Sequence, residues 1–480
     1  MHPLMPGRAS SPFAIPAIQD KEPNKLMTSR PDDAEVRACP RPSASFSRRR
    51  TEWSAETGPR SRRSSLLAIG LLPILGACSD QGLGPPEEVS PAVTGFEERS
   101  GLGFTTHSEE LAFLAAVDAE SDRVRITEVG TSVRGRPIHL VRLGYPQPAP
   151  DDQIAAGPSL LVVGSQHGNE PAGREAALQF LRDLALDEAS LLPDALSTAT
   201  VLVIPTANPD GRVANTRRNA DNVDINRDHL ALVSPEARAI AQVIRDFRPD
   251  LVVDAHERPG ATTPDLQLLW PRNLNVYGPV RDLSRALVYD HLFDQLPLAG
   301  YSVELYGAAP GGAGGEDERM LRNAVGLRHA VGLLVESAGQ LGAPLRAAAH
   351  QETMNSVLKF FWNRSSEIVT AVTAAPGAKE ASGRDRSEPF YLFGADDNAP
   401  TPDQILDPSP CAYALSTEQV TTLESQIRLL ELQTETDGSG VLVRMDQPMM
   451  TVVPFLVDAG AREPRVTGVA RVSAVECGAP

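Results

Sequence analysis

Four short, continuous apolar runs constrain what this chain can fold into. They read SLLVVGS at 159–165, VLVIP at 201–205, LVVDA at 251–255 and VGLLV at 331–335. Apolar runs of this length without alternation are typical of strands buried on both faces of a sheet. Because helix-length amphipathic segments separate and follow them, the pattern predicts an α/β domain with helices on both faces of a twisted sheet.

The same domain is predicted to begin with a β-hairpin, which would make the sheet mixed. Its strands are RVRITEVG and PIHLVRLG, on either side of the turn at Arg134–Arg136. We assign residues 105–373 to this α/β domain and the segment AAPGAKEASGRDRSE at 374–388 to a linker. Short apolar stretches with turn signals in 389–480 predict a small β-rich or α+β accessory unit.

The N-terminal part of the chain has the features of an export signal. Residues 1–60 are rich in Pro, Ser and Arg, and a basic stretch then precedes an apolar run of about ten residues, which is too short to span a bilayer. The run ends in LGAC, which resembles a bacterial lipobox with Cys78 as the lipidated residue. We therefore expect a disordered extension and signal peptide at 1–77, and a tether at 78–104. An ordinary secretory signal or a buried helix are the alternatives.

Charge and cysteine content narrow the class of protein further. The net charge is -17, and residues 1–77 carry 12 basic and 7 acidic residues, which leaves -22 for the remainder. Because residues 78–480 carry this much negative charge, nucleic acid and anionic membrane surfaces are disfavoured as binding partners. Export would permit a disulfide, and Cys411 and Cys477 are the only other cysteines after Cys78. We expect them to pair; two free thiols are the alternative.

Polar residues follow each of the predicted buried strands. His167 and Glu170 follow the first, His256 follows the third and Glu336 the fourth. Because sheets of this kind bind ligands beyond the carboxyl ends of their strands, these side chains are expected to meet. His, Glu and His suit a catalytic zinc centre with one open position, and a further carboxylate can serve as general base.

A second His-x-x-Glu exists at 107–110 and has a simpler explanation. Ser108 there is predicted to cap a helix, with acidic residues in the first turn and LAFLAAV behind it.

Five motifs in order resemble the zinc carboxypeptidase family, the carboxypeptidase A-like metallopeptidases. The resemblance covers residues 105–370 and rests on His167-x-x-Glu170, NPDG at 208–211, RRNADNVDINRD at 217–228, VVDAHE at 252–257 and LLVES at 333–337. It implies one Zn²⁺ per chain, held by His167, Glu170 and His256, with Glu336 as general base. It also implies that Asn226 and Arg227 grip the substrate's terminal carboxylate, that Arg217 (or else Arg218) stabilises the oxyanion, and that Asp224 orients a ligand histidine.

The chain departs from the family pattern in one place. Family members usually carry a Tyr on a loop some twenty residues before the catalytic Glu, whereas the stretch GAAPGGAGGEDERMLRNAVGLRHA contains none. Tyr306, further upstream, is the residue that would have to take this role.

The leading prediction is an exported, membrane-anchored zinc metallocarboxypeptidase, periplasmic or on the cell surface. It would release C-terminal residues from peptides with a free terminal carboxylate by attack of zinc-bound water. Three alternatives remain open at this point: a cell-wall muropeptide carboxypeptidase, an aspartoacylase-like deacylase of N-acyl amino acids, and a non-catalytic binding lipoprotein.

Overall fold

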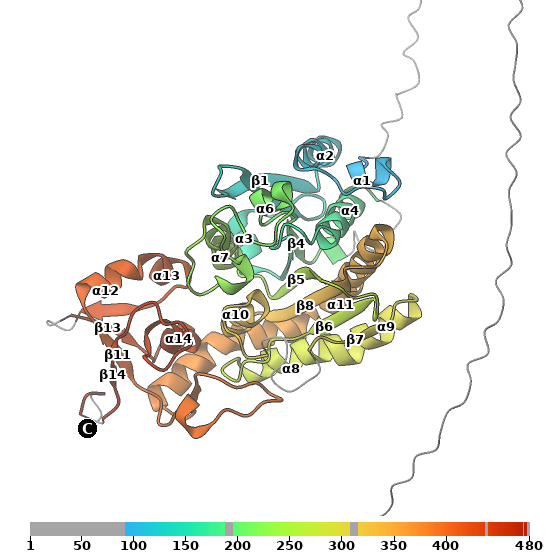
Figure 1. Cartoon of the computed structure of the whole chain (residues 1–480). Coiled ribbons are helices and arrows are strands. Elements are labelled where there is room, and N and C mark those ends of the chain that lie inside the picture. The colour runs from blue at the N-terminus through green and yellow to red at the C-terminus, as the bar shows by residue number, and fades with distance from the viewer. Residues whose placement is uncertain (1–91, 188–194, 308–314, 437–439, 474, 478–480) are drawn as a thin grey trace, which may run out of the picture. The chain divides into compact units, whose positions relative to one another are not determined.

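The computed structural model describes residues 92–187, 195–307, 315–436, 440–473 and 475–477 (Figure 1). The signal peptide expected at 1–77 and the lipidation site expected at Cys78 lie outside these ranges. In the described ranges, no helix combines the length and the apolar character that crossing a membrane requires.

An eight-stranded mixed sheet forms the centre of the catalytic domain, in the order β1-β2-β4-β3-β5-β8-β6-β7. Its middle strands β4, β3, β5 and β8 run parallel and are buried along their whole length. The apolar run in each strand predicts this burial, and in β5 and β8 the burial continues through the polar residues at the carboxyl end. The antiparallel β1–β2 hairpin joins at β4 and makes the sheet mixed. The strands are β1 (Val124–Thr131), β2 (Pro137–Leu143), β3 (Ser159–Gly164), β4 (Thr200–Ile204), β5 (Leu251–Arg258), β6 (Leu266–Leu269), β7 (Val303–Leu305) and β8 (Val331–Ala338).

Helices cover the sheet and confirm the predicted α/β class (Figure 1). Helices α4 and α11 pack against each other and on β5, whereas α7 packs on β1 and α10 on β5 and β8. The helices of this part are α1 (Gly95–Glu98), α2 (His107–Glu120), α3 (Asp151–Ala156), α4 (Ala172–Leu186), α6 (Pro209–Ala214), α7 (Pro235–Phe247), α8 (Gly278–Ala286), α9 (Phe293–Leu298), α10 (Leu321–Leu327) and α11 (Ala343–Asp385).

The start of the folded body differs from the expected tether at 78–104. Its described residues, from 92 on, already belong to the domain: Thr94 caps α1, and the Phe96 ring is buried and stacks on Phe104 at 5.2 Å. Burial of Phe96 against the Phe104 ring holds the segment on the domain, although the sequence of this segment shows no apolar period.

The cap of α2 also differs from the prediction. Thr106, not Ser108, is the N-cap, because its hydroxyl accepts from the Glu109 N–H at 3.3 Å while the Glu109 carboxylate accepts from the Thr106 N–H at 2.7 Å. Glu110, the second acid of this stretch, is buried and forms an ion pair with Arg174 of α4 at 2.7 Å. The His-x-x-Glu at 107–110 is therefore structural.

Helix α11 runs through most of the linker expected at 374–388 and ends at Asp385. It continues because Ala375, Lys379 and Ser382 are buried, and because Gly383 lets the backbone of the C-terminal unit approach closely. A Cβ at Gly383 would lie 1.9 Å from the Met445 carbonyl oxygen. Small residues that resemble a linker in sequence thus serve as a packing surface.

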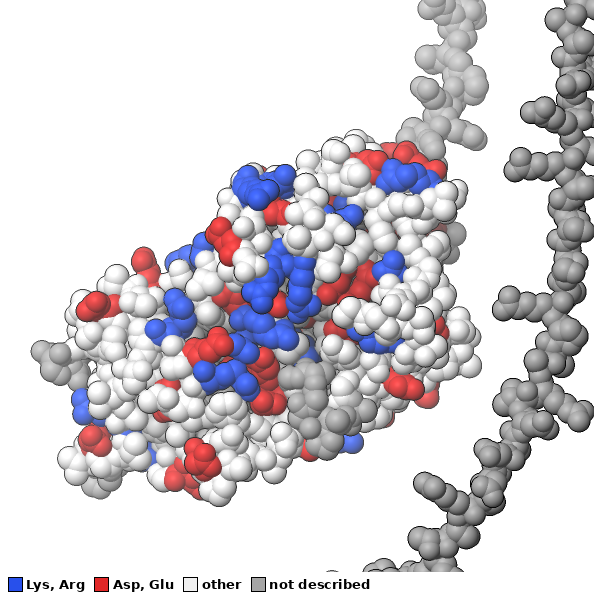
Figure 2. Space-filling model, viewed as in Figure 1, with Lys and Arg blue, Asp and Glu red and all other residues white. Residues whose placement is uncertain are grey.

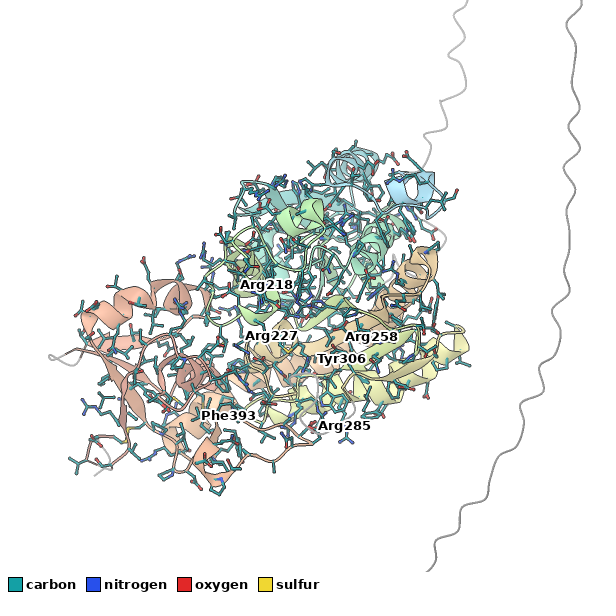
Figure 3. All side chains as sticks on the ribbon, viewed as in Figure 1. Arg218, Arg227, Arg258, Arg285, Tyr306 and Phe393 are labelled. Carbon is teal, nitrogen blue, oxygen red and sulfur yellow. A yellow bond between two sulfur atoms is a disulfide. The ribbon has the colours of Figure 1, made fainter. Side chains whose placement is uncertain are left out.

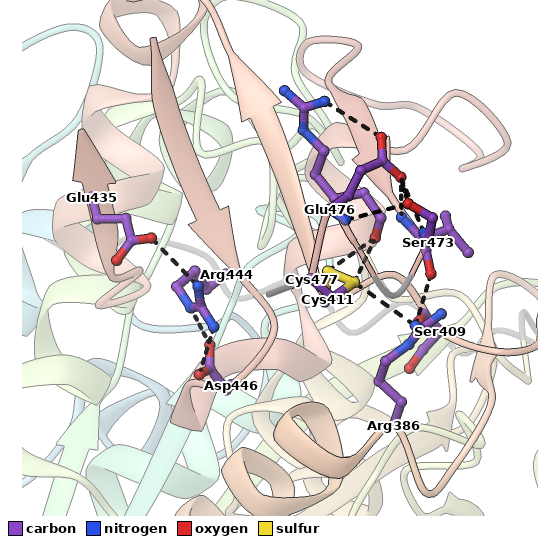
Figure 4. Close-up of a disulfide and its surroundings, with 11 residues drawn as sticks. Arg386, Ser409, Cys411, Glu435, Arg444, Asp446, Ser473, Glu476 and Cys477 are labelled. Carbon is purple, nitrogen blue, oxygen red and sulfur yellow. Dashed lines mark hydrogen bonds and ion pairs between the residues drawn. A yellow bond between two sulfur atoms is a disulfide. The ribbon is translucent and has the colours of Figure 1, made fainter. Parts of the chain in front are cut away.

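The C-terminal unit is an α+β arrangement, as predicted. A four-stranded antiparallel sheet, in the order β12-β13-β11-β14, packs with short helices, and a disulfide joins Cys411 to Cys477 across 66 residues (Figure 4). The elements are β9 (Phe390–Tyr391), β10 (Ile405–Leu406), β11 (Ala412–Leu415), α12 (Thr417–Thr422), α13 (Glu424–Leu429), β12 (Thr434–Thr436), β13 (Val441–Arg444), α14 (Val453–Val457) and β14 (Val469–Arg471).

Candidate active site

Three side chains from two neighbouring strands meet at the carboxyl edge of the sheet. His167 and Glu170 lie on the loop that leaves β3, and His256 is a residue of β5, the parallel neighbour of β3. One potential ligand atom from each lies within 4.8 Å of the other two, and all three residues are buried. Among the described residues, these are the three that form a candidate metal centre of His, Cys, Asp or Glu side chains.

The geometry of this centre fits a metal cation. The Nδ1 atoms of His167 and His256 lie 3.0 Å apart, and the Glu170 carboxylate lies 2.9 Å from the first and 2.8 Å from the second. Two nitrogen ligands of a tetrahedral zinc are separated by about 3.3 Å, given Zn–N distances of about 2.05 Å. The donor set of two imidazoles and one carboxylate therefore matches a catalytic zinc site in both chemistry and scale.

Each histidine is oriented by a carboxylate on its other nitrogen. Asp224 lies 3.0 Å from His167 Nε2, and Asp254 lies 2.7 Å from His256 Nε2. A proton held on Nε2 leaves the Nδ1 lone pair free for a metal. Burial raises the pKa of Asp224, but the hydrogen bond from His167 and the Arg217 charge outweigh it and hold the pKa well below its usual range.

Sequence reasoning found Asp224 but missed Asp254. A signal existed, because Asp254 and His256 are two residues apart on β5 and so face the same side of the sheet. Asp254 also accepts a hydrogen bond from Gln166 at 2.5 Å, and Gln166 in turn contacts His229 at 2.7 Å. His229 is buried in this network.

Glu336 stands across the parallel ladder from His256, its register partner on β8. Burial raises its pKa to about 8; the neighbouring Glu170 and Asp254 act in the same direction, and His256 and Arg217 act against them. A carboxyl group with a pKa near neutrality can both accept and donate a proton at physiological pH.

The structure separates the two candidate arginines for the oxyanion. Arg217 lies at the centre, with Nε 3.0 Å from Asp224 and Nη1 3.3 Å from Glu170, and its side chain remains 41% exposed. Arg218 is exposed and donates to the Asn222 carbonyl at 2.9 Å. Arg217 is therefore the arginine whose position suits a carbonyl oxygen beside the metal.

The two residues of the Asn226–Arg227 pair lie in different surroundings: Asn226 is buried inside the site, and Arg227 is partly exposed at its opening. The Asn226 amide is buried, 2.8 Å from His256 Nε2, and it accepts from the Leu321 N–H at 2.8 Å. The Arg227 side chain is 35% exposed and lies 3.6 Å from Asp317. In this arrangement Arg227, rather than Asn226, offers donors to a ligand carboxylate.

Tyr306 is the tyrosine beside the site. It follows β7, is half-buried, and its pKa is raised by burial and by the charge of Glu336. Figure 3 shows Tyr306 close to Arg227 and Arg258 on the same face. The glycine-rich stretch that follows, 308–314, lies outside the described residues.

The NPDG motif packs the loops beneath the site. Asn208 caps α6 by accepting from the Gly211 N–H at 2.8 Å, and its amide donates to the Gln166 carbonyl at 3.0 Å. A Cβ at Gly168 would lie 1.9 Å from the Gly211 carbonyl carbon. The glycines therefore allow the His167 loop and this turn to touch.

Comparisons with known proteins agree with this centre. Residues 110–257 match the family described as zinc carboxypeptidase, a stretch that includes the three proposed ligands and ends before Glu336. Carboxypeptidase 2 of Trichophyton rubrum is 32% identical over 196 residues, which cover 37% of this chain and 36% of the relative. The carboxypeptidase N catalytic chain of Mus musculus is 27% identical over 216 residues, covering 36% and 46%.

Among solved structures, a putative carboxypeptidase from Burkholderia mallei aligns with a TM-score of 0.46 at 21% identity, covering 53% of this chain and 67% of that one. The chain spans between 36% and 38% of the length of the fungal relatives. The matched stretch nevertheless carries the metal-site motifs up to His256 in order, and over residues 110–257 the chain is similar to the zinc carboxypeptidase family. The predicted zinc cofactor is confirmed by this family and by the His-Glu-His centre.

Proposed function

We propose that this protein is a zinc-dependent metallocarboxypeptidase that releases C-terminal amino acids from peptides. The observation that carries the proposal is the convergence of His167, Glu170 and His256 with a buried Glu336 beside them. Zinc held by the three ligands would supply a Lewis acid for the scissile carbonyl and would acidify a water molecule.

The remaining residues account for the steps of hydrolysis. Glu336 would take the proton from the attacking water and deliver it to the leaving amine. Arg217 would donate to the carbonyl oxygen as negative charge develops on it. Arg227 would hold the terminal carboxylate through its planar guanidinium. No observation favours the muropeptide, deacylase or non-catalytic alternatives.

A pair of peptides that differ at one end tests this proposal. The zinc-loaded protein is incubated with a peptide carrying a free C-terminus and with its C-terminal amide, and mass spectrometry reads the products. Stepwise loss of single C-terminal residues from the free peptide alone is the expected result. Equal cleavage of the amide, or cleavage at internal bonds, would contradict it. An Arg227→Met variant should lose discrimination between the two through a higher KM for the free peptide.

We also propose that the protein is exported and anchored by a lipid on Cys78. The support is the basic stretch, the apolar run and the LGAC sequence at 75–78. Two acyl chains on one cysteine give a stable membrane anchor. Labelling with a radioactive fatty acid should mark the full chain expressed in a bacterial host, and a Cys78→Ala variant should stay unlabelled. Equal labelling of both forms would contradict the assignment.

A further inference from the structure

Arg258 projects toward the active site but takes no part in the chemistry described above. It is the last residue of β5, two residues after His256, and therefore lies on the same side of the sheet as Asp254 and His256. The residue is 7% exposed. One guanidinium nitrogen, Nη1, donates to the main-chain carbonyl of Glu336 at 3.0 Å, and Nη2 donates to the carbonyl of Pro264.

Arg258 forms no ion pair with a carboxylate in the described part of the chain, although the charges of Glu336, Glu304 and Asp265 act on it from further away. Two other buried arginines have such ion pairs: Arg174 with Glu110, and Arg272 with Asp396 and Asp397. A largely buried guanidinium satisfied only by carbonyl oxygens is costly unless an anion joins it.

Further arginines lie around the same opening. Figure 2 shows Lys and Arg side chains gathered across the middle of this face, with Asp and Glu side chains beside them, where Figure 3 places Arg218, Arg227 and Arg258. Arg218 is exposed and has a main-chain carbonyl as its partner. The chain as a whole carries a net charge of -17, so this concentration of positive charge runs against its composition. A positive opening on an acidic protein favours the approach of anionic ligands.

We propose that the site prefers peptides with an acidic side chain on one of the two residues that flank the scissile bond, and that Arg258 binds this carboxylate. The inference rests on the proposed carboxypeptidase function. The terminal carboxylate is already assigned to Arg227, so the partner of Arg258 is a second carboxylate. A hydrogen-bonded ion pair in a site sheltered from water supplies discrimination of about 10- to 100-fold over an uncharged isostere.

Matched peptides and matched variants test this preference. Four peptides of one sequence carry Glu or Gln at the C-terminal position, or Glu or Gln at the position before it. The wild-type protein, Arg258→Met, Arg258→Lys and Arg285→Met are compared by kcat/KM, after zinc content and thermal unfolding have shown that each is folded and loaded. Arg285 is an exposed arginine on α8 whose guanidinium lies over Tyr289, away from the opening, and serves as the control (Figure 3).

The wild type should cleave the Glu peptide about 10- to 100-fold more efficiently than the Gln peptide at one of the two positions. Arg258→Met should reduce this ratio to near one, Arg258→Lys should retain part of it, and Arg285→Met should leave it unchanged. A wild-type ratio of one at both positions overturns the inference while the Gln peptides still report carboxypeptidase activity. An equal loss for Glu and Gln peptides in Arg258→Met assigns the residue a purely structural role and also overturns it. Absence of cleavage for all four peptides overturns the proposed function together with the inference.

Discussion

His256 of β5 and Glu336 of β8 are direct partners in the parallel ladder that joins the two strands. One metal ligand and the proposed general base are thus fixed by the central sheet. His167 and Glu170 reach the same point from the loop after β3, and α4 begins two residues after Glu170. Two residues of the site are therefore held by strands of the sheet. The positions of the other two, on the loop, depend on the contacts that this loop makes with its neighbours.

The contact between Asp224 and His167 should govern metal affinity. In Asp224→Asn the carboxylate that orients His167 Nε2 at 3.0 Å becomes a neutral amide, so the imidazole loses both basicity and fixed orientation. We expect zinc affinity to fall about 10- to 100-fold, measured by competition with a chelator. Asp221→Asn, at an exposed position three residues earlier, should leave the affinity unchanged. Equal affinities for wild type and Asp224→Asn would contradict the assignment.

The buried pair between Arg174 and Glu110 should contribute strongly to stability. Arg174 is fully buried, pairs with Glu110 at 2.7 Å and donates to the Thr105 carbonyl at 2.6 Å. Arg174→Met leaves a buried carboxylate unpaired, and we expect the free energy of unfolding in urea to fall by about 3–5 kcal/mol.

Two further variants serve as controls for this prediction. Arg174→Met with Glu110→Gln should lose less than Arg174→Met alone, because no unpaired charge remains. Arg125→Met, which removes an exposed arginine 3.9 Å from Asp151, should change the unfolding free energy by no more than about 0.5 kcal/mol. A loss of similar size in Arg125→Met and Arg174→Met would show that burial of the pair is not the cause.

The sequence predicted those parts of the fold that local pattern determines. Unbroken apolar runs identified β3, β5 and β8 because a strand buried on both faces leaves this signature. The end of α11 was not predictable, since Gly383 and its small neighbours resemble a linker until the Met445 backbone packs on them. Whether such a segment forms a helix depends on contacts with distant parts of the chain. The residue pattern of the segment itself carries no information about those contacts.

In the candidate site, too, some residues could be predicted from local sequence pattern and others depend on tertiary contacts. The residues that follow strands were identified from their positions and from the order of motifs. Asn226 was expected at the substrate, but the structure buries its amide against His256. The role proposed for Arg258 could not be predicted from the sequence, because only the structure shows that its guanidinium binds main-chain carbonyls and forms no ion pair with a described carboxylate.

Asp250 should make stability fall as pH rises. It immediately precedes β5 and accepts a hydrogen bond from the Ser159 N–H at 2.9 Å, and burial raises its pKa to about 6. A folded-state pKa above the unfolded value of about 3.9 stabilises the fold fully below pH 4, and this contribution is lost as pH rises through 6. Asp250→Asn keeps an acceptor for Ser159 without the ionisation.

The variant should therefore gain stability relative to wild type between pH 4 and pH 7, by up to about 3 kcal/mol. Urea unfolding at several pH values measures the difference. A gap between the two proteins that stays constant from pH 4 to pH 7 would show that Asp250 has the same pKa in both states.

Activity and zinc content of Glu336→Gln test the central claim most directly. Glu336 is proposed as the base and is not one of the three zinc ligands, so the variant should keep one zinc per chain and the stability of the wild type. Its kcat on a peptide with a free C-terminus should fall by about 10²- to 10⁴-fold, since the amide cannot accept the proton of water. A Glu336→Gln protein that retains both its zinc and near-wild-type activity would contradict the assignment of this site.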